Sequence, residues 1–142
     1  MAEQTRGATL RRAIEAVAAP DDASIAALGD LFTEDVVVWT PNVFATDRDA
    51  LADWLGYREE AFSDVALEIT ALDVFGNKGF AEFAFGATFS GPLAIDEDTV
   101  LEPNGQRVLL GAAAVADFDG GKIKALRGYF DELSLLEQLF TE

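Results

Sequence analysis

Cysteine and histidine are both absent from this 142-residue chain. Without cysteine there is no disulfide framework, no thiol nucleophile and no zinc ribbon. Without histidine there is no Ser-His-Asp triad and no histidine-ligated metal site. Any proton transfer must therefore involve carboxylates, tyrosine, lysine or a bound water molecule.

Positive charge is scarce. The chain has 10 Lys and Arg residues against 26 Asp and Glu residues, which gives a formal net charge of −16. There is no basic stripe of the kind that neutralises nucleic-acid phosphates. No apolar run reaches the roughly 18 residues that a membrane helix needs, and the N-terminus lacks a signal-peptide pattern. We therefore predict a cytoplasmic protein that binds neither nucleic acid nor membranes. Its acidity fits an ordinary acidic protein or a salt-adapted one.

What the chain does have is apolar material for a single domain spanning residues 1–142. Hydrophobic residues make up 50% of it, and 11 residues are Phe. Apolar residues at helical spacing predict helices over 5–17, after Asp21 and over 46–62, where Thr46 and Asp49 form a capping pattern. A short β-branched run at 36–39 predicts a strand between the second and third helices.

Beyond the third helix the apolar period changes to two, which is typical of strands. Strands are predicted at 66–75, 80–90, 107–118 and 122–130, followed by a short helix over 132–140. Helices followed by an antiparallel meander form an α+β fold. Strand 107–118 is apolar on both faces. Both faces should therefore be covered, one by the helices and the other by a second subunit in a homodimer.

Six short segments occur in a characteristic order: residues 31–37 (LFTEDVV), 61–64 (AFSD), 86–91 (GATFSG), 118–123 (FDGGKI), 129–131 (YFD) and 135–139 (LLEQL). In this order the chain resembles, over nearly its full length, the SnoaL-like polyketide cyclases of the NTF2-like superfamily. The resemblance implies a cone-shaped barrel, with three N-terminal helices on a curved antiparallel sheet, a short C-terminal helix and an apolar pocket. Such cyclases close a ring by an intramolecular aldol step without a metal or an organic cofactor. The implied ligand is a small hydrophobic, polyketide-like carbonyl compound.

The resemblance also implies a general acid/base near the end of the last long strand, where this chain has Asp131. Arg127 and Tyr129 alternate with Asp131, so the three side chains should share one face, and Arg127 or Tyr129 could stabilise an oxyanion. Structural roles are the alternative. Asp131 could cap helix 132–140, and Arg127 could pair with Asp131 or with another carboxylate.

Four further residues are candidate ligand contacts. Glu82 shares a strand face with small residues that leave room for a ligand, or else lies exposed on the outer face of the sheet. Trp39 and Asn42 flank the end of the first strand, near the expected pocket mouth. They could instead belong to the core and to a turn. Tyr57 could donate a hydrogen bond to a ligand oxygen, or pack its ring on the helix and keep its hydroxyl in water.

Other functions of the same superfamily fit the residues less well. Ketosteroid isomerases need a Tyr and two acids in other positions, and the first predicted helix has no Tyr. Limonene-type epoxide hydrolases need an Asp-Arg-Asp arrangement, and no Arg-x-Asp occurs on the middle strands. The main alternative is a non-catalytic module for ligand binding or dimerisation. Catalysis requires Asp131 to face the cavity unpaired, whereas the alternative tolerates it as an ion pair or a cap.

Overall fold

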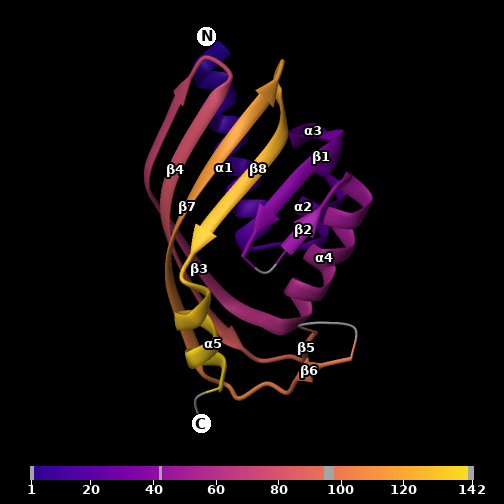
Figure 1. Cartoon of the computed structure of the whole chain (residues 1–142), viewed down its shortest axis with the longest axis vertical. Helices are drawn as coiled ribbons and strands as arrows, with labels where there is room; N and C mark the ends of the chain where they lie inside the picture. Colours follow the sequence, from indigo (N-terminus) through magenta and orange to yellow (C-terminus); the bar gives the residue numbers. More distant parts are fainter. Residues whose placement is uncertain (1, 42, 95–97, 141–142) are drawn as a thin grey trace.

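A strongly curved sheet organises the molecule, and its strands come from both halves of the chain. The computed structural model describes residues 2–41, 43–94 and 98–140. The sheet has the strand order β2-β1-β8-β7-β4-β3, and it bends around the N-terminal helices (Figure 1). Its strands are β1 (Phe32–Thr40), β2 (Val43–Ala45), β3 (Phe62–Phe75), β4 (Lys78–Phe89), β7 (Arg107–Asp119) and β8 (Lys122–Phe130).

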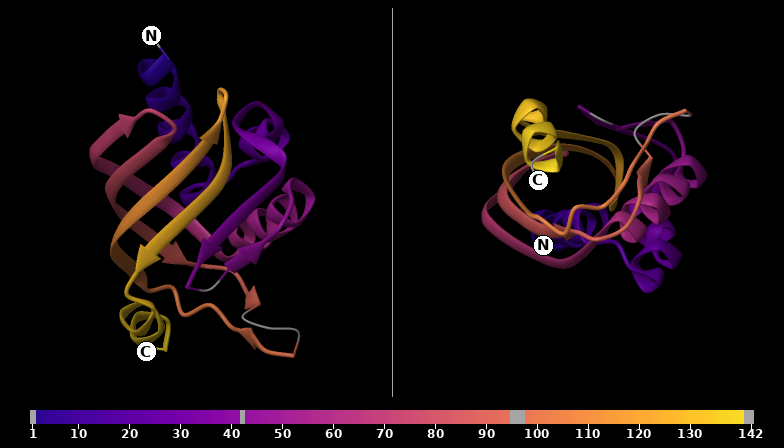
Figure 2. Two further views of the ribbon diagram at one scale, coloured as in Figure 1. Left: turned by 45° about the horizontal axis from the view of Figure 1, so that its top comes forward. Right: turned by 90° about the horizontal axis from the view of Figure 1, so that it is seen from below.

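Helices occupy the concave side of the sheet and its wide end. They are α1 (Ala2–Ala18), α2 (Asp22–Ala26), α3 (Leu28–Leu31), α4 (Arg48–Ala61) and α5 (Glu132–Phe140). A small separate ladder joins β5 (Leu93–Ala94) to β6 (Val100–Leu101). Seen from below, α5 and the β5–β6 segment lie around the open end of the rolled sheet (Figure 2).

The α+β fold with a curved sheet and a short C-terminal helix is confirmed, and α5 has the predicted bounds. Two details differ. The predicted second helix is interrupted at Ala27, so it forms the two short helices α2 and α3. Strand β1 pairs parallel to β8, whereas the other neighbouring strands of the large sheet are antiparallel. The long connection between β1 and β8 permits a parallel pair, which a hairpin could not form.

Helix α4, which contributes to the cavity described below, begins one residue later than the capping pattern predicted. Asp47, and not Thr46, is its N-cap: an Asp47 side-chain oxygen accepts a 2.7 Å hydrogen bond from the Ala50 amide. Such a bond satisfies one of the free amides of the first turn. Leu51 and Leu55 then lie fully buried one turn apart and fix the helix against the sheet.

The far end of the sheet is closed by α5. Leu135 and Leu139 pack against Phe89 and Val108 in a second apolar cluster. The Gln138 side-chain amide donates a 3.0 Å hydrogen bond to the Leu109 carbonyl oxygen and accepts a 2.7 Å bond from the Leu109 amide. This side chain replaces a neighbouring strand at a point where β7 extends beyond the end of β8, and so it joins α5 to the sheet.

The turn after β4 requires glycine at position 91. The Gly91 amide donates to the Ala61 carbonyl oxygen at 3.1 Å, and a Cβ at Gly91 would lie 1.9 Å from the Glu60 carbonyl oxygen. Gly91→Ala should therefore lower the free energy of unfolding by about 1–3 kcal/mol because backbone must move. Gly56→Ala is the matched control: a Cβ there meets nothing within 4 Å, and it should raise stability by about 0.5–1 kcal/mol. Urea unfolding measures both changes, and equal effects would contradict the packing argument.

Asp117 is the centre of a charge cluster on the convex face. Its carboxylate forms ion pairs with Lys78 on β4 and, at 2.8 Å, with Arg127 on β8. The hydrogen bond from Arg127 is the main reason that the pKa of Asp117 lies below its ordinary value of 3.8. A depressed folded-state pKa stabilises the fold above the ordinary value, and this stabilisation is lost as the pH falls through the folded-state value.

Asp117→Asn should accordingly lower the free energy of unfolding near neutral pH. The difference from the wild type should become smaller as the pH drops below 3.8. Urea unfolding at a series of pH values measures this, with the exposed Asp73→Asn on β3 as the control. A deficit that stays constant across the acid range would contradict the ion-pair interpretation.

Candidate functional site

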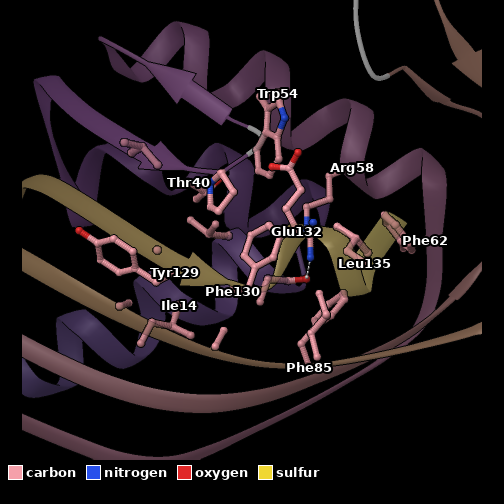
Figure 3. A pocket seen from close by; sticks show the side chains of 18 of the residues that line it. Ile14, Thr40, Trp54, Arg58, Phe62, Phe85, Tyr129, Phe130, Glu132 and Leu135 are labelled. Carbon is pink, nitrogen blue, oxygen red and sulfur yellow. Dashed lines mark hydrogen bonds between the residues drawn. The ribbon is translucent and has the colours of Figure 1, made fainter. Parts of the chain in front are cut away.

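An apolar cavity lies between the concave face of the sheet and helices α1, α4 and α5. Its volume is about 450 Å³, within the usual range of small-molecule sites. Most of its wall is aliphatic or aromatic (Figure 3). The larger apolar residues of its lining are Ile14, Val17, Val38, Trp54, Phe62, Phe83, Phe85, Leu110, Leu126, Phe130, Leu135, Leu136 and Leu139.

Arg58 is the charged residue that α4 presents to this apolar wall. Its guanidinium carbon lies 5.7 Å from the ring centre of Trp54, 5.4 Å from that of Phe62 and 4.7 Å from that of Phe85. The spacing of four residues from Trp54 to Arg58 and again to Phe62 places them along one side of the chain. Cation–π attraction to the three rings therefore holds the guanidinium in the cavity.

The polar contacts of Arg58 are few. One terminal nitrogen donates to the Ala18 carbonyl oxygen at 3.5 Å, which is long for a hydrogen bond. Its Nε atom is buried and has no hydrogen-bond partner among the described residues, although the side chain as a whole retains some exposure. Burial lowers the pKa of Arg58 from 12.5 to about 10. The group therefore remains a cation at neutral pH.

Glu132 provides a carboxylate in the same cavity. It is the first residue of α5, and it is partly buried where the chain passes from β8 into the helix. Figure 3 shows its side chain extending from α5 toward the α4 side of the cavity, where Trp54 and Arg58 lie. Within the described part of the chain, both ion pairs involve Asp117. No carboxylate oxygen of Glu132 therefore lies within 4.0 Å of a guanidinium nitrogen of Arg58.

Asp131 lies beside Glu132 in sequence but in a different environment. Its side chain is exposed, and its Oδ1 atom accepts a 3.1 Å hydrogen bond from the Ser134 amide at the start of α5. It does not line the cavity. The structure thus places Asp131 as a helix cap, the arrangement that the non-catalytic alternative tolerates, and its role as acid/base stays a prediction that this geometry does not favour.

Arg127 and Tyr129 do share a face of β8, as predicted, but it is the convex face. Arg127 pairs with Asp117 and not with Asp131. Tyr129 packs on Trp39 with ring centres 5.5 Å apart. Although Tyr129 borders the cavity, its hydroxyl points away from Arg58 and Glu132 (Figure 3). The three residues therefore do not converge on one point.

The other predicted ligand contacts are dispersed. Trp39 and Glu82 are exposed and lie outside the cavity lining. Tyr57 lines the cavity but is largely exposed, which places it at the rim. Asn42 lies outside the described residues.

Sequence reasoning did not select the two charged residues that the cavity brings together. A signal for Arg58 was present, since it interrupts the apolar face of the helix formed by Leu51, Trp54, Leu55 and Phe62. Glu132 carried no separate signal, because a strand-to-helix junction does not show which of two adjacent acids turns inward.

Within residues 2–41, 43–94 and 98–140, no group of three or more acidic side chains is placed to hold a metal ion. In the same ranges, no helix is long and apolar enough to cross a membrane.

Known structures share this architecture. A proposed SnoaL-like polyketide cyclase from Jannaschia sp. CCS1 superposes with a TM-score of 0.85 at 14% identity, covering 99% of this chain and 94% of that one. IdmH, a proposed polyketide cyclase from Streptomyces antibioticus, superposes with a TM-score of 0.72 at 16% identity, covering 96% of this chain and 99% of IdmH. An LEH-like epoxide hydrolase from M. tuberculosis superposes with a TM-score of 0.70 at 14% identity, covering 96% of this chain and 90% of the hydrolase.

At such low identities the superpositions establish the fold alone. No curated protein matches the sequence. The family model described as a SnoaL-like domain matches residues 10–126, which is most of the chain. This chain therefore belongs to the SnoaL-like family.

Proposed function

We propose that this chain is an enzyme of the cyclase or isomerase type, which moves a proton on a hydrophobic carbonyl compound inside the cavity. The observation that carries the proposal is the presence of a carboxylate and a guanidinium, not paired with each other, in an otherwise apolar cavity of about 450 Å³. Membership of the SnoaL-like family supports an enzymatic role. Two of the similar structures carry the name of proposed polyketide cyclases.

The two groups suit the formation and collapse of an enolate. Glu132 removes a proton from the carbon next to the carbonyl group and returns it at the new position. Arg58 binds the carbonyl oxygen and stabilises the negative charge that develops there, an interaction strengthened by the surrounding aromatic rings because they exclude water. The reaction is redox-neutral and needs no oxidant or reductant, and the proposal routes no step through a metal or an organic cofactor.

A model carbon acid tests the proton-transfer step without knowledge of the natural substrate. 2-Tetralone is apolar and carries acidic protons next to its carbonyl group, and their exchange for deuterium in D₂O can be followed by NMR. The wild-type protein should accelerate this exchange. Glu132→Gln should slow it by about 10²–10⁴-fold, as expected for loss of a general base.

Asp131→Asn is the matched control, because asparagine caps a helix as well as aspartate does but cannot accept the proton. It should leave the exchange rate within about twofold of the wild-type rate. If Asp131→Asn abolishes exchange and Glu132→Gln does not, the acid/base role belongs to Asp131. If neither variant changes the rate, the proposed chemistry is wrong.

A binding module with the same cavity is the second candidate. The observation that favours it is the capping role of Asp131, the residue that matches the catalytic motif of the family resemblance. A wild-type protein that binds 2-tetralone in saturation-transfer experiments but does not accelerate its deuterium exchange would support this candidate over the enzyme.

We also propose that the convex face of the sheet is a homodimer interface. Strand registers place on this one face the exposed side chains of Trp39, Phe44, Phe80, Leu109 and Tyr129. Exposed apolar surface of this kind usually marks a contact site. Charges of both signs mix on this face, where the strand registers place Lys78, Arg107 and Arg127 together with Glu68, Asp73, Glu82 and Asp117, whereas the whole chain carries −16. Two copies can therefore approach through this face with little repulsion.

Light scattering coupled to size-exclusion chromatography should show a dimer whose population increases with salt, because screening reduces repulsion between the acidic surfaces. Leu109→Glu, at a site 65% exposed on the convex face, should give a monomer; Leu133→Glu, at a site 66% exposed on α5, should not. A wild-type monomer at all salt concentrations, or equal effects of the two variants, would contradict the interface.

A further inference from the structure

The cavity contains a positive charge, Arg58, that forms no ion pair with any of the described residues. Arg58 is surrounded by Trp54, Phe62 and Phe85, and its one hydrogen bond within the described part of the chain, to the Ala18 carbonyl oxygen, is 3.5 Å long. Among the described residues, no carboxylate lies within 4.0 Å of its guanidinium. The buried Nε atom is without a partner as well. A buried charge without a counter-charge is unfavourable, and proteins normally pair such groups.

A purely structural role does not account for this arrangement. Arginines that serve only the fold usually donate several short hydrogen bonds or form bidentate ion pairs, as Arg127 does in part with Asp117 at 2.8 Å. Arg58 instead presents its planar group to an open volume of about 450 Å³. The aromatic rings orient the guanidinium without using its N–H groups, so these remain available to a ligand.

We propose that the cavity binds a ligand that is already an anion before any reaction occurs: an apolar, ring-sized molecule with one ionised oxygen group, either a carboxylate or an acidic enol. The inference rests on the proposed function only in taking the same cavity as the ligand site. It adds the charge of the ligand, which a carbonyl compound polarised only in the transition state would not have. Two parallel N–H···O bonds from the two terminal nitrogens of Arg58 would neutralise the ionised oxygen group of the ligand.

Glu132 is the other charge facing this ligand, and it acts in the opposite direction. Its carboxylate lines the cavity but does not pair with Arg58. A bound anion would therefore be attracted by Arg58 and repelled by Glu132. Substitution of each residue by a neutral one should change anion affinity with opposite sign, which a structural role for either residue does not predict.

The test compares three ligands of similar shape by isothermal titration calorimetry with the full chain. They are 2-naphthoate, a carboxylate; 2-hydroxy-1,4-naphthoquinone, an enol ionised at neutral pH; and 2-acetylnaphthalene, a neutral ketone. The wild type should bind at least one anion more tightly than the ketone, and which anion is preferred identifies the oxygen group. Preference for the ketone over both anions would overturn the inference.

Substitutions then locate the effect. Arg58→Met should weaken anion binding by about 10- to 100-fold and ketone binding by a clearly smaller factor, because the ketone loses a hydrogen bond to its carbonyl oxygen and the anion loses an ion pair. Arg58→Lys should give an intermediate loss, because the charge remains but the planar fork is gone. Glu132→Gln should strengthen anion binding. Equal weakening of anion and ketone in both Arg58 variants would overturn the proposal and identify Arg58 as a packing residue.

Thermal unfolding of the ligand-free variants shows whether each variant is folded, so that a loss of binding is not caused by unfolding. Arg58→Lys keeps a cation and serves as the variant to interpret if Arg58→Met does not fold. Because these measurements are of binding alone, they are independent of 2-tetralone exchange. Anion-selective binding without deuterium exchange would support this inference and contradict the enzymatic proposal. Deuterium exchange without anion-selective binding would support the enzymatic proposal and contradict this inference.

Discussion

Burial of the concave face of one curved sheet is the constraint on which the rest of the structure depends. The inward side chains of β4, β7 and β8 are apolar and must be removed from water. Helices α1 and α4 cover part of this face, with Leu10, Ile14, Leu51 and Leu55 fully or almost fully buried. Toward the wide end the helices no longer fill the space, and α5 closes it from outside. Since protein interiors are otherwise close-packed, the remaining volume of about 450 Å³ is the candidate ligand site of the molecule.

The same constraint explains how two charged groups come to lie in an apolar wall. Arg58 is held on a helix that is anchored by its own buried leucines, and Glu132 begins a helix that Gln138 ties to β7. Both groups are therefore fixed by elements that pack for other reasons. In such surroundings electrostatic interactions are stronger than in water, so a small number of polar groups determines which ligand chemistry the cavity accepts.

Strand β8 separates the two functions that we assign to the sheet. Leu126, Gly128 and Phe130 line the cavity, while Arg127 and Tyr129 face outward, in accordance with the period of two. Residues one position apart in the sequence thus belong to different sites. Arg127 faces outward through this alternation, and Asp117 neutralises its charge there. Among the described residues, Arg58 is the arginine that lines the cavity.

The sequence by itself determined most of the fold. Helical periodicity and alternation of apolar residues placed α1, α4, β3, β4, β7, β8 and α5 near their observed positions, because these signals come from local geometry and from burial of one face. It could not show that β1 lies parallel to β8, or that α2 and α3 are separate helices, since strand order and short helices depend on distant contacts.

The site was decided by tertiary structure. The alternation of Arg127, Tyr129 and Asp131 correctly predicted a shared face for the first two but gave no information on which side of the sheet that face lies. Asp131 and Glu132 are adjacent acids, and only the packing of α5 turns one into the cavity and leaves the other as a cap. Arg58 was visible as a charge on an apolar helix face. That no carboxylate of the described residues pairs with Arg58 became evident only from the tertiary structure, because ion pairing depends on positions in space and not on sequence spacing.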